Sequence, residues 1–230
     1  FDRSRLPAGP RRAVYTAIYG SYDQLHPAPD SARRDGIDFV CFTDDPAMAA
    51  RGWQVRLHPA RYPHPRMAAK YFRALPHVVL PEYEETLWVD GSFSIRSGRL
   101  AREAFACLKG ASIAVFSHPD RNCIYDEAEF SRTMRKYADQ DIRGQVAHYR
   151  GQGYPAHHGL FANGIMARRR DDPAIRRLNE MWLEENVRFT YQDQLSLPFL
   201  LWKLDIHPAI FRQHLWRTRW GRWNAHAHNG

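Results

Sequence analysis

The stretch EETLWVDGSFSI, residues 84–95, decides the fold, because an apolar strand ends in it on an acidic residue. Residues 87–89 have the continuous apolar character of a strand covered on both faces, and Asp90 ends that run directly before Gly91. A carboxylate at the end of a buried strand is costly unless a cation or a hydrogen bond compensates it. From this segment alone, a binding role for Asp90 and a role as a cap or turn residue are equally favoured.

Further apolar segments along the chain predict the neighbours of this strand. The predicted strands are 13–19, 37–43, 53–57, 86–90, 112–118 and 160–168, and the predicted helices are 65–75, 98–109, 123–139, 171–186 and 191–203. Strands that alternate with helices predict an α/β sandwich on a mostly parallel sheet. Ligands bind such open sheets beyond the carboxyl ends of the strands, so we expect Asp90 at the rim of a cleft.

Length and composition predict one globular domain. The chain has 230 residues, of which 44% are hydrophobic, and we expect residues 1–12 to be a linker or an expression boundary and residues 13–230 to form a single domain. Neither a signal peptide nor a membrane-spanning run is visible, which favours a cytoplasmic location. Cys41, Cys107 and Cys123 lie far apart without a CxxC pair, which favours a reducing compartment.

The net charge of +8 predicts anionic partners. Nucleic acid, an acidic membrane surface and a phosphorylated substrate all satisfy that condition. The basic residues are spread along the chain, and neither an RNP motif nor a zinc-finger spacing is present, so we expect no nucleic acid partner. Peripheral membrane association stays open, and the oligomeric state is not predicted.

Six short runs, in order, resemble a known family. The runs are YTAIYGSYDQL (15–25), DFVCFTDD (38–45), WVDGS (88–92), HPDRNCIYDEA (118–128), GLFANGIMARR (159–169) and DQLSLPFLLWK (193–203). Together they resemble the plant and bacterial family called domain of unknown function 616, described as hexosyltransferase-like, and they are also similar to family 8 glycosyltransferases. The resemblance implies a GT-A-like, Rossmann-like fold, a nucleotide-sugar donor, most simply UDP-linked, and a Mn²⁺ or Mg²⁺ ion.

A row of basic residues is the first candidate donor contact. Arg66, Lys70 and Arg73 recur at helical spacing and share one face, which on a surface helix is usually solvated. The resemblance places Lys70 against the donor and the acidic motif.

The resemblance also implies a set of metal ligands. Asp90 would be the first ligand, and Ser92 stands where family 8 enzymes usually carry a second Asp, so weaker metal binding or none is an alternative. His226 or His228 would be the third ligand, since imidazole binds Mn²⁺, although a terminal segment is as often disordered.

The remaining candidate residues follow the predicted strands. Ordinary turns, loop caps and solvated side chains are the alternatives for them. The donor-binding candidates are Thr16, Ala17, Tyr19, Tyr22, Asp44, Arg66, Lys70, Asp90, Gly91, Arg121 and Asn163, and the acceptor-side candidates are His118, His157 and His158.

Asp193 and Gln194 open the last predicted helix and are the catalytic candidates. An acidic residue at that position is often only a helix cap. The resemblance places Asp193 near the anomeric carbon of the donor sugar, with Gln194 beside it.

The predicted function is therefore that of a glycosyltransferase in polysaccharide biosynthesis. It would move a hexose or a uronic acid from the nucleotide sugar to a glycan acceptor, with metal and with retention of configuration if the family 8 likeness extends that far. A ceramidase-like, metal-dependent hydrolase and a non-catalytic nucleotide- or glycan-binding module are the alternatives. The sugar and the acceptor are not predicted.

Overall fold

The computed structural model describes residues 9–33 and 35–224 and contains one central sheet and one small sheet. The central sheet has the strand order β3-β2-β1-β4-β7-β6-β8, and β5 pairs with β9. The strands are β1 Arg12–Ile18, β2 Asp38–Thr43, β3 Gln54–Leu57, β4 Glu85–Val89, β5 Phe93–Ile95, β6 Ile113–Ser117, β7 Phe161–Arg169, β8 Ala209–Ile210 and β9 Gly221–Trp223. The helices are α1 Asp30–Arg33, α2 Pro65–Ala74, α3 Pro76–Val79, α4 Arg99–Ala106, α5 Ile124–Arg132, α6 Ile142–Gly151, α7 Pro173–Arg188 and α8 Asp193–Lys203.

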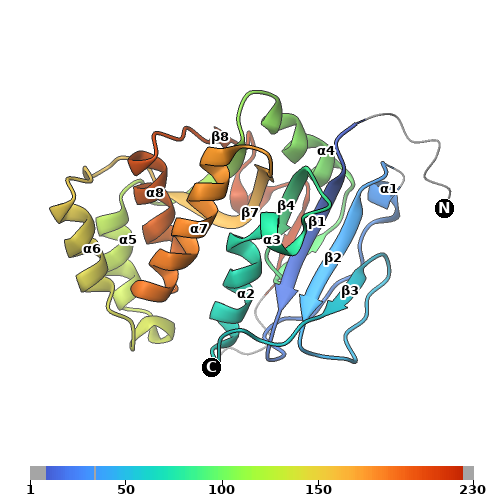
Figure 1. Ribbon diagram of the computed structural model, residues 1–230, viewed down its shortest axis with the longest axis horizontal. Coiled ribbons are helices and arrows are strands. Elements are labelled where there is room, and N and C mark those ends of the chain that lie inside the picture. Colours follow the sequence, from blue (N-terminus) through green and yellow to red (C-terminus); the bar gives the residue numbers. More distant parts are fainter. Residues whose placement is uncertain (1–8, 34, 225–230) are drawn as a thin grey trace.

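The predicted α/β sandwich with a mostly parallel sheet is confirmed. β1 pairs in parallel with β2 and β4, β2 with β3, and β6 with β8. The arrows of β1, β2 and β3 end at the same edge of the sheet (Figure 1). Only β7 runs the other way among these strands, antiparallel to β4 on one side and to β6 on the other.

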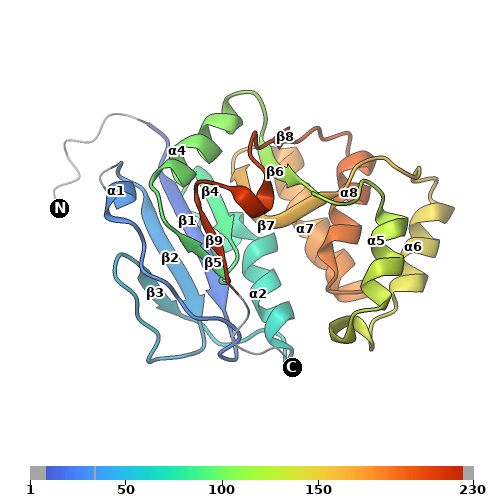
Figure 2. The same ribbon diagram turned by 180° about the vertical axis from the view of Figure 1, so that it is seen from behind.

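Helices cover both faces of the sheet, and the alternation of side chains along the strands creates two apolar layers. Tyr15 of β1 and Trp88 of β4 face the layer under α2 and α7, whereas Val14 and Leu87 face the layer under α4. Figures 1 and 2 show α2 and α7 on one side, with α4 and the β5–β9 pair on the other. Continuous burial of the strands explains why they read as apolar runs rather than as alternating ones.

Several short elements were not predicted from the sequence. Helix α6 was missed because its glycines weaken the helical pattern. Its N-cap is Asp141, whose carboxylate accepts a hydrogen bond from the amide of Gly144 at 2.9 Å. The predicted helix 123–139 is divided, since α5 ends at Arg132 and a separate turn of 3-10 helix follows. β5 and β9 have three residues each and depend on each other for pairing.

The helices were also compared with the length and apolar character of a membrane span. None of those in residues 9–33 and 35–224 combines the length and the apolar character that a membrane span needs.

Candidate functional site

The main cleft lies where the order of the strands reverses. The chain passes from β1 to β2 and β3 on one side, then returns to place β4 on the other side of β1. In open α/β sheets the carboxyl ends of two such strands diverge and leave room for a ligand. A cavity of about 400 Å³ lies at this point, lined by Ile18 and Tyr19 beyond β1 and by Asp90 and Gly91 beyond β4.

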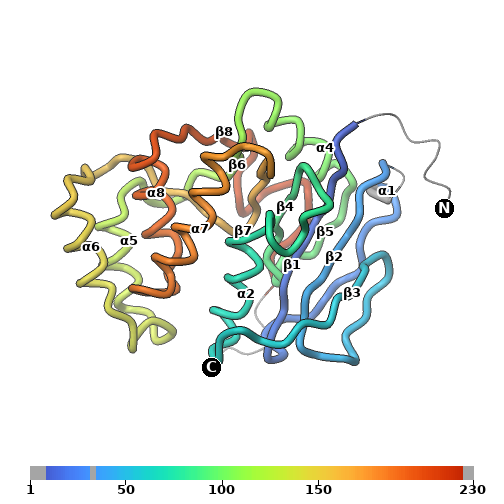
Figure 3. Tube along the Cα trace, in the orientation of Figure 1, coloured from blue at the N-terminus to red at the C-terminus, as the bar shows by residue number. Residues whose placement is uncertain are grey.

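Helix α2 supplies the central cation of the cleft. It begins at Pro65, with His64 as its cap, and Figure 3 shows it running alongside β1. Arg73, in its last turn, is 8% exposed at the side chain and donates from Nη1 to Asp90 Oδ1 at 3.1 Å. Its other guanidinium nitrogen contacts Asp193 Oδ2. One side chain therefore holds together the carboxylates that follow β4 and begin α8.

Asp193 is a buried carboxylate between two cations. Its side chain is 6% exposed, and Lys70 Nζ donates to Oδ2 at 2.6 Å. Desolvation by burial, followed by the charge of Arg73, lowers the pKa of Lys70 well below its ordinary value. Removing one partner of such a buried pair leaves an uncompensated charge, which costs about 3–5 kcal/mol.

Asp90 is more open and has one oxygen committed to the protein. Oδ1 accepts from Arg73 and from Trp88 Nε1 at 2.7 Å, while the side chain is 32% exposed. Oδ2 lies beside Gly164, where an added Cβ would approach within 3.0 Å. The amide of Asp90 donates to the carbonyl of Gly164 at 2.8 Å, which fixes the loop against β7. The glycine therefore keeps one face of the carboxylate clear.

The described part of the cleft fits a hard divalent cation that shares its shell with a ligand. Asp90 Oδ2 and the hydroxyl of Ser92 offer two protein oxygens, and Mg²⁺ is commonly bound by one or two carboxylates together with substrate phosphates and water. No group of three His, Cys, Asp or Glu ligands surrounds Asp90 in the residues that are described.

A second cationic feature forms one wall of the cleft. Arg66 Nε donates to the hydroxyl of Tyr22 at 3.0 Å, and its guanidinium lies 5.0 Å and 5.8 Å from the ring centroids of Tyr22 and Tyr191. Lys136 lines the same wall; desolvation and then the charge of Arg66 lower its pKa. Neither cation forms an ion pair with a carboxylate in the described ranges, so both remain available to an anionic ligand.

Two tryptophans also line the cleft. Trp216 is 57% exposed, and its ring lies 6.0 Å from that of Trp223. Pairing of β9 with β5 places Trp223 opposite Phe93, and Asn224 donates to the carbonyl of Ser92. An exposed aromatic side chain at a cleft mouth offers a flat apolar surface to a ligand.

Comparison with known proteins places this site in a family. The family model of the TOD1/MUCI70 glycosyltransferase-like domain matches residues 2–218. The chain belongs to this family. It is also 25% identical over 208 residues to the probable hexosyltransferase MUCI70 of Arabidopsis thaliana, a match that covers 80% of this chain and 36% of that relative. The chain therefore spans about a third of the length of this curated relative, and the comparisons support a glycosyltransferase at the level of the family.

The fold of this glycosyltransferase-like domain brings most of the sequence-predicted residues to one place. Residues from distant parts of the chain meet at the cleft, because β1, β4 and β7 are neighbours and α2 and α8 pack beside them. The predicted residues that line it are Ala17, Tyr19, Tyr22, Arg66, Lys70, Asp90, Gly91, Ser92, Asn163, Asp193 and Gln194.

Asn163 is a buried polar residue within β7, so its side chain needs hydrogen-bond partners. Its Nδ2 donates to the carbonyl of Asp193 at 3.2 Å, but its Oδ1 is buried without a hydrogen-bond partner among the described residues. A free acceptor at the cleft is suited to a ligand hydroxyl, because a buried acceptor without a donor is costly.

Arg121 and His118 do not line the cleft. Arg121 Nε donates to Glu127 Oε2 at 2.6 Å, and His118 Nε2 lies 3.9 Å from the same oxygen. Glu127 is buried and also accepts from Gln192 Nε2 at 2.9 Å. Arg121 therefore supports the segment before Asp193 through Glu127, in place of the predicted phosphate contact.

The other predicted residues lie elsewhere. Thr16 is buried within β1, and Asp44 accepts from the amide of Gly20 at 3.2 Å. His157 and His158 are exposed in the loop before β7, outside the cleft lining. His226 and His228 lie outside the described residues.

Sequence reasoning missed several residues of the cleft. Arg73 was placed on the basic helix face but was not assigned to the site, and its central position depends on the packing of α8. Lys136, Tyr191, Trp216 and Trp223 were not proposed. Only Trp223 had a signal, since tryptophans near the end of the chain indicate a segment that packs against something.

Proposed function

We propose that this domain transfers a hexose or a uronic acid from a UDP-sugar to a glycan acceptor. The observation that carries the proposal is the pair of carboxylates, Asp90 and Asp193, held together by Arg73 in a cleft at the strand reversal. Asp90 is partly exposed, whereas Asp193 is buried between Lys70 and Arg73. Such a pair is suited to two tasks, the binding of a cation and the stabilisation of positive charge on a sugar. The family membership supports the same chemistry.

The donor diphosphate would bind at the wall of Arg66 and Lys136. Lys70 and Arg73 are already paired with carboxylates, whereas Arg66 and Lys136 have no such partner in the described ranges. Cations that lack a carboxylate are the natural contacts for a diphosphate, and arginine forms bidentate bonds to phosphate oxygens. Tyr22 or Tyr191, beside Arg66, would stack on the nucleotide base.

A Mn²⁺ or Mg²⁺ ion would bind Asp90 Oδ2 and Ser92, with His226 or His228 as a further ligand. When bound, the ion would neutralise charge on the departing diphosphate. Arg73 fixes the orientation of Asp90 by occupying Oδ1, so the second oxygen faces the ligand side. Ser92 contributes an uncharged oxygen, which makes the affinity depend on the bound diphosphate.

Asp193 would lie next to the reacting carbon of the sugar. The amino end of α8 and the ion pairs to Lys70 and Arg73 hold its carboxylate in one orientation. A fixed carboxylate there favours the positive charge that develops as the glycosidic bond to the diphosphate breaks. Retention of the anomeric configuration is part of the proposal, from the likeness to family 8 enzymes.

The acceptor would approach over Trp216 and Trp223. Both tryptophans line the same cleft as Arg66 and Lys136, and Asn224, next to Trp223, donates to the carbonyl of Ser92. The apolar face of a pyranose ring matches an exposed indole, which gives the acceptor a position without charge contacts.

Release of UDP from a panel of UDP-sugars, with and without Mn²⁺, tests the proposal. We expect release from one hexose or uronic acid donor, greater when an acceptor oligosaccharide is present. UDP should also raise the melting temperature, and more so with Mn²⁺, because it binds the folded state. Binding of UDP without turnover of any donor would favour a non-catalytic module. Amide hydrolysis of a ceramide without any UDP effect would favour the hydrolase.

A further inference from the structure

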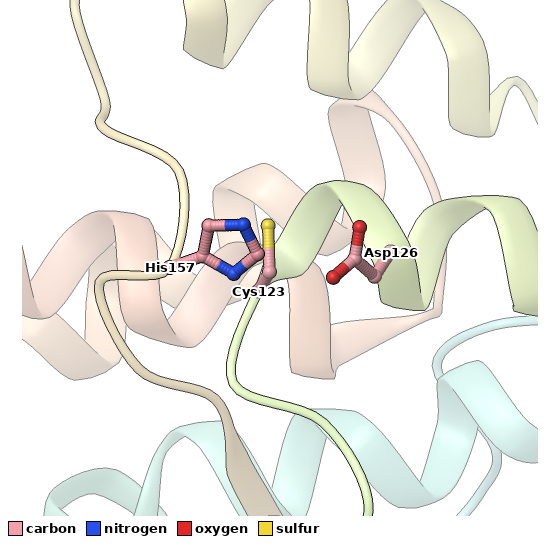
Figure 4. A group of neighbouring side chains, drawn as sticks. All are labelled: Cys123, Asp126 and His157. Carbon is pink, nitrogen blue, oxygen red and sulfur yellow. The ribbon is translucent and has the colours of Figure 1, made fainter.

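A second group of metal-ligating side chains lies outside the cleft, at the amino end of α5. Cys123 caps this helix, Asp126 lies in its first turn, and His157 belongs to the loop between α6 and β7. The sulfur, a carboxylate oxygen and a ring nitrogen all lie within 4.8 Å of one another. Figure 4 shows the three side chains facing a common space from two separate segments.

The ring of His157 is already oriented for a metal. Its Nδ1 lies 3.0 Å from Asn122 Oδ1, and an amide oxygen only accepts hydrogen bonds, so the proton is on Nδ1. The lone pair of the other nitrogen, Nε2, is then left for a cation. Metal-binding histidines commonly donate their second N–H to a carbonyl or carboxylate in this way.

The segment that carries His157 also holds a buried polar group without a partner. Cys123 is 2% exposed and is a free thiol. The hydroxyl of Tyr154, whose ring lies 5.8 Å from that of His158, is buried with no hydrogen-bond partner in the described ranges. Buried polar groups without partners are rare and point to an absent ligand.

The backbone of the loop supports the same arrangement. His157 has φ of 54°, in the left-handed region that is unfavourable for a residue with a side chain. The amide of Gly159 donates to the carbonyl of Asn122 at 3.0 Å, which ties the loop to the segment before α5. A ligand shared by both segments would offset the cost of this conformation.

We propose that Cys123, Asp126 and His157 bind one Zn²⁺ ion, with water in the fourth position. A set of sulfur, nitrogen and oxygen donors suits Zn²⁺, whereas Mg²⁺ and Mn²⁺ prefer oxygen ligands such as those of Asp90. The ion would fasten the loop before β7 to α5, the helix that carries Glu127 beneath Gln192. This site does not depend on the proposed glycosyl transfer.

Titration of the untagged, chelator-treated chain with Zn²⁺, in competition with a chromophoric chelator, tests the site. We expect one Zn²⁺ per chain, at least tenfold weaker in Cys123→Ser and in His157→Asn. Asn122→Ala should weaken binding by about 10–100-fold, because it removes only the partner that orients the ring. Co²⁺ in place of Zn²⁺ should give a thiolate charge-transfer absorption that Cys123→Ser abolishes.

The controls separate this site from other metal ligands. Cys107→Ser and His158→Asn should leave Zn²⁺ binding unchanged. Cys123 is buried, so Cys123→Ser could fail to fold, and the melting temperature of this variant without metal would reveal that. In that case the His157→Asn variant, at an exposed position, tests the site. Absence of saturable Zn²⁺ binding would overturn the proposal. The proposal would also be overturned if Zn²⁺ binding were retained in His157→Asn and lost in a double variant with His226→Ala and His228→Ala.

Discussion

Asp90 and Asp193 are held by the same guanidinium, that of Arg73, although they belong to distant parts of the chain. The contact with Arg73 explains how a carboxylate, that of Asp90, is tolerated at the end of the central strand β4. Arg73 and the indole N–H of Trp88 compensate one oxygen of Asp90, and the other oxygen, Oδ2, lies beside Gly164. The buried cation therefore orders two acidic groups with different exposure, and their different surroundings suit different roles.

The substitution Asp193→Asn should abolish sugar transfer and lower the stability of the protein. It is nearly isosteric but leaves Lys70 and Arg73 without their buried carboxylate, which costs about 3–5 kcal/mol. UDP affinity should stay the same or increase, because two cations near the diphosphate are released. Thermal unfolding and calorimetric UDP titration measure both effects, and a loss of UDP affinity would instead identify Asp193 as a donor-binding residue.

Asp90→Ala should weaken Mn²⁺ binding in the presence of UDP, while Ser92→Asp should strengthen it. The first change removes the only carboxylate of the proposed shell, and the second adds one, which a hard cation prefers to a hydroxyl. Titration of Mn²⁺ into each UDP-saturated variant is the measurement, with His226→Ala and His228→Ala alongside. If Asp90→Ala binds Mn²⁺ as wild type does, Asp90 is a turn residue stabilised by Arg73.

Gly164→Ala should disturb the metal side of the cleft. The new Cβ would come within 2.4 Å of a Trp223 ring carbon and 3.0 Å of Asp90 Oδ2, so one of the two must move. We expect a loss of about 1–3 kcal/mol of stability and weaker Mn²⁺-dependent UDP binding. Gly110→Ala is the matched control, since nothing lies within 4 Å of its added Cβ. Equal effects in both variants would contradict this role for Gly164.

UDP affinity should fall with rising pH through the ionisation of Lys136. Desolvation and the charge of Arg66 lower the pKa of Lys136, and only its protonated form attracts the diphosphate. Binding is therefore strongest below this lowered pKa and is lost as the pH rises through it, earlier than for an ordinary lysine.

Lys136→Arg should remove this fall, because arginine keeps its charge. Lys136→Ala and Arg66→Ala should both weaken UDP binding, and each should reduce its dependence on salt. Arg188→Ala, on α7 away from the cleft lining, is the control. A pH profile identical in wild type and Lys136→Arg would exclude Lys136 as the titrating group.

Trp216→Ala should raise the KM for the acceptor and leave UDP affinity unchanged. The side chain is mostly exposed, so its loss should change stability by no more than about 0.5 kcal/mol. Initial rates at varied acceptor concentration and saturating donor measure the effect. Val187→Ala, an exposed apolar residue on α7, controls for general surface changes. An unchanged acceptor KM would place the acceptor elsewhere.

The sequence by itself determined the layers of the fold and one edge of the site. Apolar runs such as Leu87–Val89 identify strands covered on both faces, because burial on two sides removes polar residues from the whole run. Asp90 directly follows such a strand. Open sheets bind ligands at the carboxyl ends of their strands, so the sequence also placed Asp90 at the rim of the cleft. Helical spacing likewise placed Arg66, Lys70 and Arg73 on one face of α2.

Only the tertiary structure decided which charges meet and which remain uncompensated. Spacing along α2 does not reveal which distant residues reach it. The pairing of Arg73 with Asp193, and the lack of an ion pair between Arg66 and any carboxylate in the described ranges, could therefore not be predicted from the sequence. The reversed direction of β7, which brings Gly164 to Asp90, likewise depends on pairing between distant strands. Periodicity reports local burial, whereas partners across the fold are selected by packing and by the cost of leaving a buried charge alone.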